Sequence, residues 1–134
     1  PIQTINELKD ILMRYAPKHR ENKYFAQVFQ ALRIEVNDEL AVLEEFLMQV
    51  PEVLNPEGRL VVMSYHSLED RLVKNFIQKG KFDGEVEKDF YGNEIKPMRG
   101  ITRKPIEATP EEVARNPRAR SAKLRIAEMP ALKA

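Results

Sequence analysis

Apolar side chains recur at intervals of three and four residues through the first third of the chain, which predicts a series of amphipathic helices. The first helix is expected to begin after Thr4, with Glu7 completing a capping box, and to end at Pro17. A second helix is expected over about 24–36 and a third over about 38–54. No helix-breaking residue separates these two, so one continuous helix is an open alternative.

A different pattern follows the turn signal Asn55-Pro56-Glu57-Gly58. Residues 60–65 are apolar without alternation and rich in β-branched side chains, which is typical of a strand buried on both faces in a parallel sheet. A helix capped by Ser67 is expected over about 68–78. Helix, turn, buried strand and helix together predict one unit of a doubly wound α/β sheet.

The last part of the chain is less regular. Residues 80–97 are polar with scattered aromatic side chains, which predicts a long loop. We expect a strand over 100–104, a short helix that begins at Thr109 and stops at Asn116, and a final strand over 122–129. In that final strand apolar side chains alternate with basic ones.

Composition narrows the class of protein. The 134 residues are 32% charged and 43% hydrophobic, which is the mixture of a globular domain. No stretch approaches the roughly 18 apolar residues that a membrane span needs, and no secretory signal opens the chain. Cysteine is absent, which excludes disulfides and thiolate metal sites. These features favour a cytoplasmic protein without a membrane partner.

Charge is unevenly distributed, although the net charge is only +1. Residues 99–125 contain eight basic side chains and three acidic ones, a net charge of +5. Most of the basic residues are arginines, whose guanidinium groups offer paired donors to phosphate. The segment therefore favours a nucleic-acid partner, and a solvated basic tail is the alternative.

The sharpest cluster of polar side chains lies where the buried strand is expected to end and the next helix to begin. Ligands of open α/β sheets bind at this edge. The candidate site residues here are His66, Ser67, Asp70 and Arg71. The alternative is a helix cap, an acid that complements the helix dipole and a local ion pair. A hydrolytic centre of His66 and Ser67 is disfavoured, because no glycine frames either nearby serine as a nucleophile elbow requires.

Two further groups of side chains suit RNA. Gln30, Arg33 and Asn37 fall on one helix face, where amide and guanidinium groups suit a base edge or a phosphate; a solvent-facing polar stripe is the alternative. Near the Asn116-Pro117 turn, three arginines form a candidate phosphate clamp: Arg115, Arg118 and Arg120. A basic loop that protects an edge strand would look the same.

Three segments, in this order, resemble the MraW family: FQALRIEVNDEL (29–40), NPEGRLVVMSYHSLEDRLVKNF (55–76) and NPRARSAKLRIAE (116–128). Tyr65 stands where the family pattern would have phenylalanine. The resemblance runs over about 5–128. It implies an S-adenosylmethionine-dependent methyltransferase that methylates N4 of a cytidine in bacterial small-subunit ribosomal RNA. A non-catalytic RNA-binding or ribosome-assembly module is the alternative.

The resemblance also implies a fold. Residues 1–39 are expected to be the end of a helical substrate-recognition insert, and 40–134 the C-terminal part of the methyltransferase domain. The fold class is α/β, with a partial Rossmann-like class I methyltransferase sheet. The final strand is expected to pair antiparallel with the strand near 100–104, both beside strand 60–65.

By the resemblance, the family's glycine-rich cofactor loop, acidic ribose-binding residue and catalytic loop are expected to lie N-terminal to this sequence. No Gly-x-Gly-like loop occurs in it, because the five glycines are dispersed at 58, 80, 84, 92 and 100. The resemblance therefore implies S-adenosylmethionine for the full-length enzyme, no cofactor for this chain alone, and no activity for it alone. The uncovered edge of strand 60–65 is expected to make the isolated chain self-associate.

Overall fold

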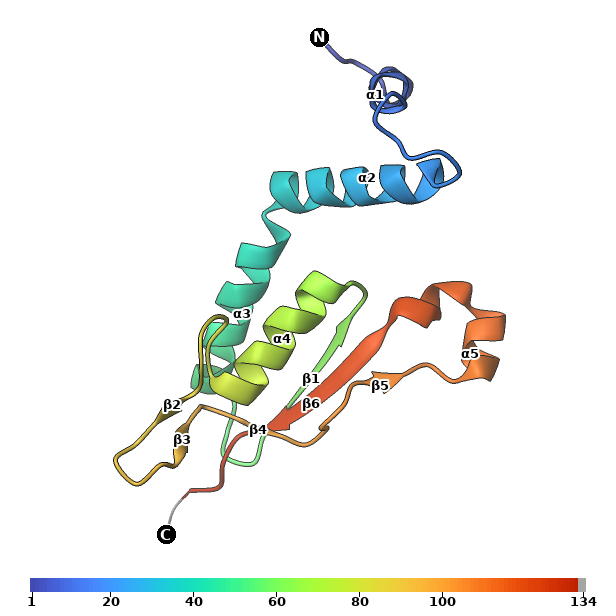
Figure 1. Ribbon diagram of the computed structural model, residues 1–134. Coiled ribbons are helices and arrows are strands. Elements are labelled where there is room, and N and C mark those ends of the chain that lie inside the picture. The colour runs from blue at the N-terminus through green and yellow to red at the C-terminus, as the bar shows by residue number, and fades with distance from the viewer. Residues whose placement is uncertain (133–134) are drawn as a thin grey trace. The chain divides into compact units, whose positions relative to one another are not determined.

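The computed structural model describes residues 1–132 (Figure 1). The chain divides into two compact units, of which the first is Pro1–Glu39 and the second begins at Leu40. Helices and short antiparallel strands are both present, so the chain is mixed α and β as expected. Over the described residues, every helix is too short or too polar to cross a membrane.

The first unit contains two helices. Helix α1 (Ile5–Leu12) begins at the predicted capping box: the Thr4 hydroxyl accepts from the Glu7 N–H, and the Glu7 carboxylate accepts from the Thr4 N–H. The expected end at Pro17 is wrong. The helix stops at Leu12, whose carbonyl accepts from the Tyr15 N–H at 2.9 Å, so a tight turn replaces the last helical turn.

A residue with a left-handed backbone conformation separates the next two helices. Helix α2 (Glu21–Asn37) ends where Asp38 adopts a φ of 52°, and α3 (Glu39–Val53) begins directly afterwards. The Asp38 N–H still donates to the Ile34 carbonyl. One continuous helix is therefore wrong. Aspartate is among the few residues that enter the left-handed region at small cost, so the break needs neither glycine nor proline.

The sheet of the second unit is antiparallel. Strand β1 (Arg59–Ser64) pairs with the final strand β6 (Lys123–Glu128), whose other edge carries β4 (Arg99–Gly100) and β5 (Ile106–Glu107). The strand order is β1-β6-β4. The predicted antiparallel pairing of the final strand with one near residue 100 is confirmed. The expectation that both lie beside β1 is wrong, because β6 separates β4 from β1.

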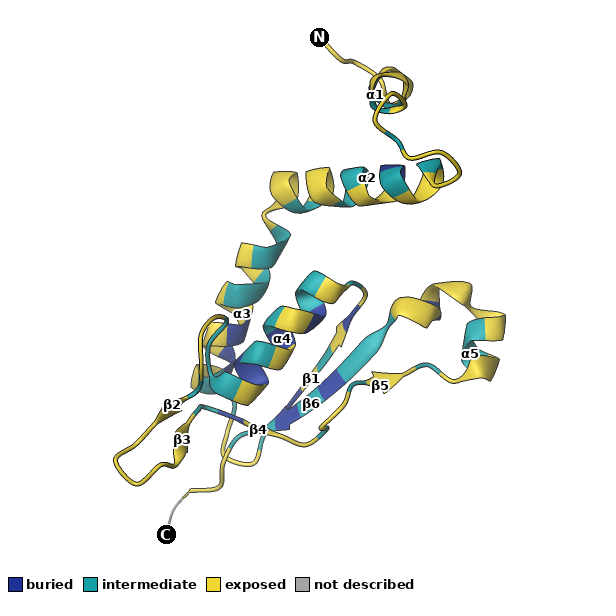
Figure 2. Cartoon of the chain, in the orientation of Figure 1, coloured by how far each residue is buried: buried dark blue, intermediate teal, exposed yellow. Residues whose placement is uncertain are grey.

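Two helices cover one face of this sheet. Helix α4 (Ser67–Lys79) and helix α3, from Leu40 onward, lie on the same side of β1 and β6 (Figure 1). The buried core lies between them, as the dark residues of Figure 2 show. Its members are Leu47, Val50, Leu60, Val73, Phe76, Ile77, Met98 and Ala127.

The opposite face is open in the described residues. Along β1, Leu60 and Ser64 are buried, whereas Val61 and Met63 are more than half exposed. The prediction of a strand buried on both faces in a parallel sheet is therefore wrong for this structure. The unbroken apolar run is real, but α3 and α4 pack on the same side and leave the other without a cover.

Segment 80–97 is only partly a loop. It contains a two-stranded hairpin of β2 (Glu87–Lys88) and β3 (Glu94–Ile95), which extends from the core (Figure 1). Further along, α5 (Pro110–Arg115) begins at the predicted Thr109 cap, and the 3-10 helix η1 (Pro117–Ser121) follows it. The segment from α5 through η1 returns the chain to the start of β6.

Candidate functional site

The junction of β1 and α4 is held by the side chains of its own residues. His66 is the N-cap of α4, and its Nδ1 accepts from the Glu69 N–H at 3.4 Å. The Glu69 carboxylate reaches back and accepts from the Tyr65 N–H at 3.0 Å. The prediction that Ser67 caps this helix is wrong. Ser67 is the first helical residue, because the imidazole nitrogen takes the capping role one position earlier.

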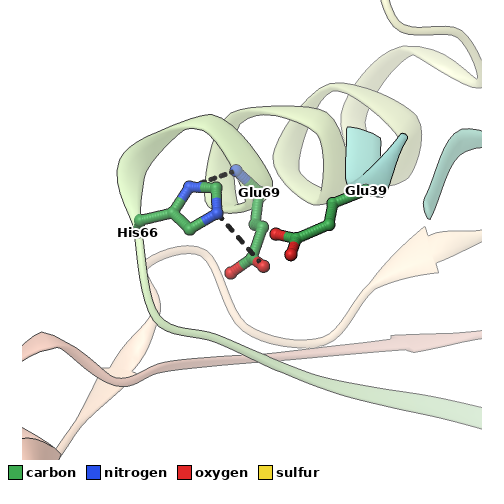
Figure 3. Close-up of side chains that lie close together, drawn as sticks. All are labelled: Glu39, His66 and Glu69. Carbon is green, nitrogen blue, oxygen red and sulfur yellow. Dashed lines mark hydrogen bonds and ion pairs between the residues drawn. The ribbon is translucent and has the colours of Figure 1, made fainter. Parts of the chain in front are cut away.

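The second ring nitrogen of His66 also faces Glu69. Nε2 lies 3.2 Å from Glu69 Oε1 (Figure 3), is buried, and makes no hydrogen bond with the described residues. An Nδ1 that accepts a hydrogen bond carries no proton, so the neutral imidazole has its proton on Nε2 beside the carboxylate. Nδ1 is thus occupied by the Glu69 N–H, and Nε2 lies beside the Glu69 carboxylate without a hydrogen bond. No hydrogen bond links either ring nitrogen to Ser67, so the geometry disfavours hydrolytic chemistry.

Asp70 is a buried ion-pair partner. Its two carboxylate oxygens lie 2.7 Å from Arg125 Nε and 3.0 Å from Arg125 Nη2, a paired contact between α4 and β6. Only 8% of Asp70 and 7% of Arg125 is exposed. The hydrogen bonds from Arg125 lower the pKa of Asp70, against burial, which raises it. Asp70 is therefore committed to holding α4 on the sheet and does not face a ligand.

Two candidates at this junction remain accessible. Ser67 and Arg71 lie on the first turns of α4 and are exposed. The structure thus divides the predicted cluster: His66 and Asp70 have structural partners, whereas Ser67 and Arg71 face solvent. A ligand at this edge would meet the hydroxyl and the guanidinium first.

Two of the predicted polar side chains of α2, Arg33 and Asn37, contact the same carboxylate, that of Glu39. Arg33 Nε lies 2.9 Å from Glu39 Oε1, and the Asn37 side-chain amide donates to the same oxygen at 3.2 Å. Gln30 is half-buried and borders a shallow hollow together with Arg33. Arg33 and Asn37 do share a face, but their shared partner is the first residue of α3.

The three arginines of the α5–η1 segment are exposed. Arg115 is paired with Glu112 at 3.2 Å within the same helix. Arg118 and Arg120 make no ion pair with any described residue. Both lie on a short 3-10 helix that a proline begins, so two unneutralised guanidinium groups are carried on a constrained backbone.

A hollow of about 670 Å³ lies on the open face of the sheet beside these arginines. Its floor is formed by Met63, Tyr65 and Leu124, and η1 contributes Arg118 and Ala119 to its wall. The Tyr65 side chain is 56% exposed. The hollow therefore combines an apolar floor, an aromatic ring and the cationic Arg118, and two acidic side chains, Glu107 and Glu112, also line it.

Two residues here lay outside the predicted site. Arg125 stood in a strand where charge alternates with apolar residues, which normally indicates a solvent face; its partner Asp70 is 55 positions away. Tyr65 enters the sequence analysis only as a departure from the family pattern. The sequence could have indicated Tyr65 by its position directly after the apolar strand and before the helix cap, because a side chain there projects from the end of the sheet.

Comparison with known proteins gives consistent matches. A model described as the MraW methylase family matches residues 1–130. The chain is 59% identical over 128 residues to the ribosomal RNA small subunit methyltransferase H of Cytophaga hutchinsonii, covering 96% of the chain and 43% of that protein. Proteins of the same name from Parabacteroides distasonis and Amoebophilus asiaticus are 57% and 54% identical, over 95% and 98% of the chain. The chain spans about two fifths of the length of these relatives.

Proposed function

The chain belongs to the MraW methylase family, and on that basis we propose that it is part of an S-adenosylmethionine-dependent methyltransferase acting on small-subunit ribosomal RNA, at N4 of a cytidine. The names of the relatives support the methyltransferase reaction and the ribosomal RNA substrate. The specificity for N4 of a cytidine and a cytoplasmic location follow from the resemblance of the three segments at 29–40, 55–76 and 116–128.

The fold supports placing unit Leu40–Ala134 in the methyltransferase domain, as the end of a Rossmann-like class I sheet. Strands β1 and β4 both run antiparallel to β6 and are therefore parallel to each other, so the reversed final strand lies between two strands of the same direction. On this proposal unit Pro1–Glu39 belongs to a helical substrate-recognition insert, which would place Gln30, Arg33 and Asn37 on the RNA side.

The observation that carries the RNA proposal is the pair of unneutralised arginines beside the apolar hollow. Arg118 and Arg120 would contact phosphates, with Arg115 next to them. Tyr65 offers an exposed ring on which an unpaired base can stack. Ser67 and Arg71 lie on the first two turns of α4 and would face the same strand of RNA.

The link between β1 and α4 lacks the features of a cofactor-binding loop. A dinucleotide-type loop needs glycines between a strand and the next helix, whereas the link from β1 to α4 is Tyr65-His66. The first N–H groups of α4 are directed to this segment's own acceptors: Glu69 N–H to the imidazole, and Asp70 N–H to the His66 carbonyl at 3.1 Å. We therefore propose that S-adenosylmethionine is held by other parts of the full-length enzyme and that this chain alone is inactive.

The test is made on the full-length enzyme with small-subunit ribosomal RNA. Arg118→Ala combined with Arg120→Ala is expected to weaken RNA binding and to lower the salt slope, d log K/d log [salt], by about 0.7–0.9 for each lost phosphate contact. Arg59→Ala combined with Arg99→Ala is the matched control, because it removes two exposed arginines at the opposite end of β6. Equal RNA affinity and equal salt slope in both double variants would refute the assignment.

Methyl transfer separates this function from a purely binding role. Transfer of a labelled methyl group from S-adenosylmethionine to the RNA, followed by nucleoside analysis, should give N4-methylated cytidine. Salt-sensitive RNA binding without methyl transfer by the full-length protein would instead support a non-catalytic RNA-binding or ribosome-assembly module.

A further inference from the structure

A small hollow with cationic walls lies where α4 meets the segment that follows β4. Its volume is about 160 Å³, and none of the described residues that line it is acidic. Sites for whole small molecules usually measure about 300–1,000 Å³, so this hollow suits a single chemical group rather than a nucleoside. Its polar lining consists of Lys74, Gln78, Lys96, Thr102, Arg103 and Arg125.

Two of the four positive charges in this hollow are already neutralised. Arg125 belongs to the buried ion pair described above, and Lys96 Nζ lies 2.6 Å from Glu94 Oε2. Lys74 and Arg103 are exposed and make no ion pair with any described residue. Four cationic side chains and two partner carboxylates leave a net charge of +2. The hollow therefore attracts an anion through side chains that line it.

The wall formed by the segment after β4 is fixed to the sheet. The Ile126 N–H donates to Thr102 Oγ1 at 3.1 Å, and the Ile126 carbonyl accepts from the Ile101 N–H at 2.9 Å. Gly100 lets this segment lie directly against α4, because a Cβ there would be 3.1 Å from Ile77 Cγ2. The Thr102 hydroxyl donates to no described acceptor, so it can donate to a ligand. An anion would thus meet a wall that is already ordered.

The hollow lies at the end of a polar row on α4. Arg71, Lys74 and Gln78 are exposed and follow one another at spacings of three and four, so they share one face of the helix. Arg71 is among the residues that the proposed function places beside RNA. This face therefore leads from the β1–α4 junction to the hollow.

The hollow is separate from the one beside η1. Leu124 of β6 lines the hollow on the open face of the sheet, whereas its neighbour Arg125 lines the small hollow. Successive side chains of a strand point to opposite faces. The two hollows therefore lie on opposite faces of β6.

We propose that the small hollow binds one backbone phosphate of the RNA between Lys74 and Arg103. The Gln78 side-chain amide and the Thr102 hydroxyl supply neutral donors to the same phosphate. The inference rests on the proposed function, because it extends the path of the RNA along α4 from Arg71. It adds a phosphate contact on the helix-covered face of the sheet to those of the η1 arginines.

The binding experiment uses the full-length enzyme and small-subunit ribosomal RNA at several salt concentrations. Lys74→Ala and Arg103→Ala are each expected to lower RNA affinity by about tenfold. Because both side chains hold the same phosphate, the double variant should lose less than the product of the two single losses. Its salt slope should fall by about 0.7–0.9, the value for one phosphate. Both side chains are exposed, so the variants should fold, which circular dichroism checks.

The matched control is Lys88→Ala combined with Arg59→Ala. It also removes one exposed lysine and one exposed arginine, neither of which lines the hollow, and it should leave RNA affinity unchanged. Equal RNA affinity in the hollow double variant and this control overturns the proposal. Single losses that multiply in the double variant also overturn it, because independent surface charges need no shared phosphate.

Two further measurements separate the alternatives. Inorganic phosphate is titrated into the full-length enzyme while the amide chemical shifts of residues 100–103 are followed. Saturable shifts, together with RNA affinity that no hollow variant changes, would assign the hollow to a free anion and overturn the RNA contact. The Arg118→Ala, Arg120→Ala double variant is measured in parallel. If it loses RNA affinity and the hollow variants do not, this inference fails while the proposed function stands; the reverse result leaves the hollow assigned and refutes the η1 contacts.

Discussion

Removing one partner of the buried Asp70–Arg125 pair should destabilise the protein strongly and unequally. Asp70→Leu leaves a guanidinium that is 7% exposed and cannot lose its proton, which is expected to cost about 3–5 kcal/mol of unfolding free energy. Arg125→Met leaves a carboxylate that can become neutral by binding a proton and still has Lys123 Nζ at 3.9 Å. That loss should be smaller, about 1–3 kcal/mol.

The double variant separates pairing from burial. With Asp70→Leu and Arg125→Met together, no charge is left buried and the volume is partly filled, so stability should return to within about 1 kcal/mol of the parent. The control is Arg59→Met, which removes the ion pair between Arg59 and Glu128. The Arg59 side chain is 65% exposed. That change should cost no more than about 1 kcal/mol.

Urea unfolding followed by circular dichroism measures all four variants. The reasoning is refuted if Asp70→Leu costs no more than Arg59→Met, or if the double variant is as unstable as the sum of its parts. Acid adds a check. The pKa of Asp70 is lower in the folded protein than its usual value of about 3.9, so the pair's contribution is complete above that value and is lost as pH falls through the lowered one. The double variant should lose this part of the pH dependence.

Three other outcomes are expected. Calorimetry on the 134-residue chain alone should show no saturable S-adenosylmethionine binding, and micromolar binding would contradict the proposed location of the cofactor site. Light scattering on the same chain should show self-association through the open face around Val61 and Met63 and the free edge of β1, whereas a monomer that binds no apolar dye would contradict it. Hydrogen bonds from Asn93 lower the pKa of Asp89, so the hairpin turn should be intact above the usual aspartate pKa and should loosen as pH falls through the lowered one; chemical shifts of the tip amides that stay constant down to strongly acidic pH would contradict this.

Local signals in the sequence were sufficient for most of the elements. The Thr4–Glu7 capping box, the Thr109 cap and the apolar run before Ser64 each depend on residues a few positions apart, and the structure has each in its predicted place. The order of the three motifs was also sufficient to indicate the family, because a sequence motif can be identified without knowledge of how its residues are arranged in space. These features are encoded within one turn of helix or one strand.

Long-range contacts settled the roles of individual side chains. The alternation in β6 placed Arg125 with Lys123 on a polar face, yet the structure buries Arg125 because Asp70 meets it from α4. His66 is a candidate site residue in the sequence, but in the structure its Nδ1 caps α4 and its Nε2 is buried beside the Glu69 carboxylate. Periodicity reports which residues share a face of one element, but it carries no information on which other element covers that face. Whether a charged group binds a ligand or holds the fold together therefore depends on partners that only the folded chain brings within hydrogen-bond distance.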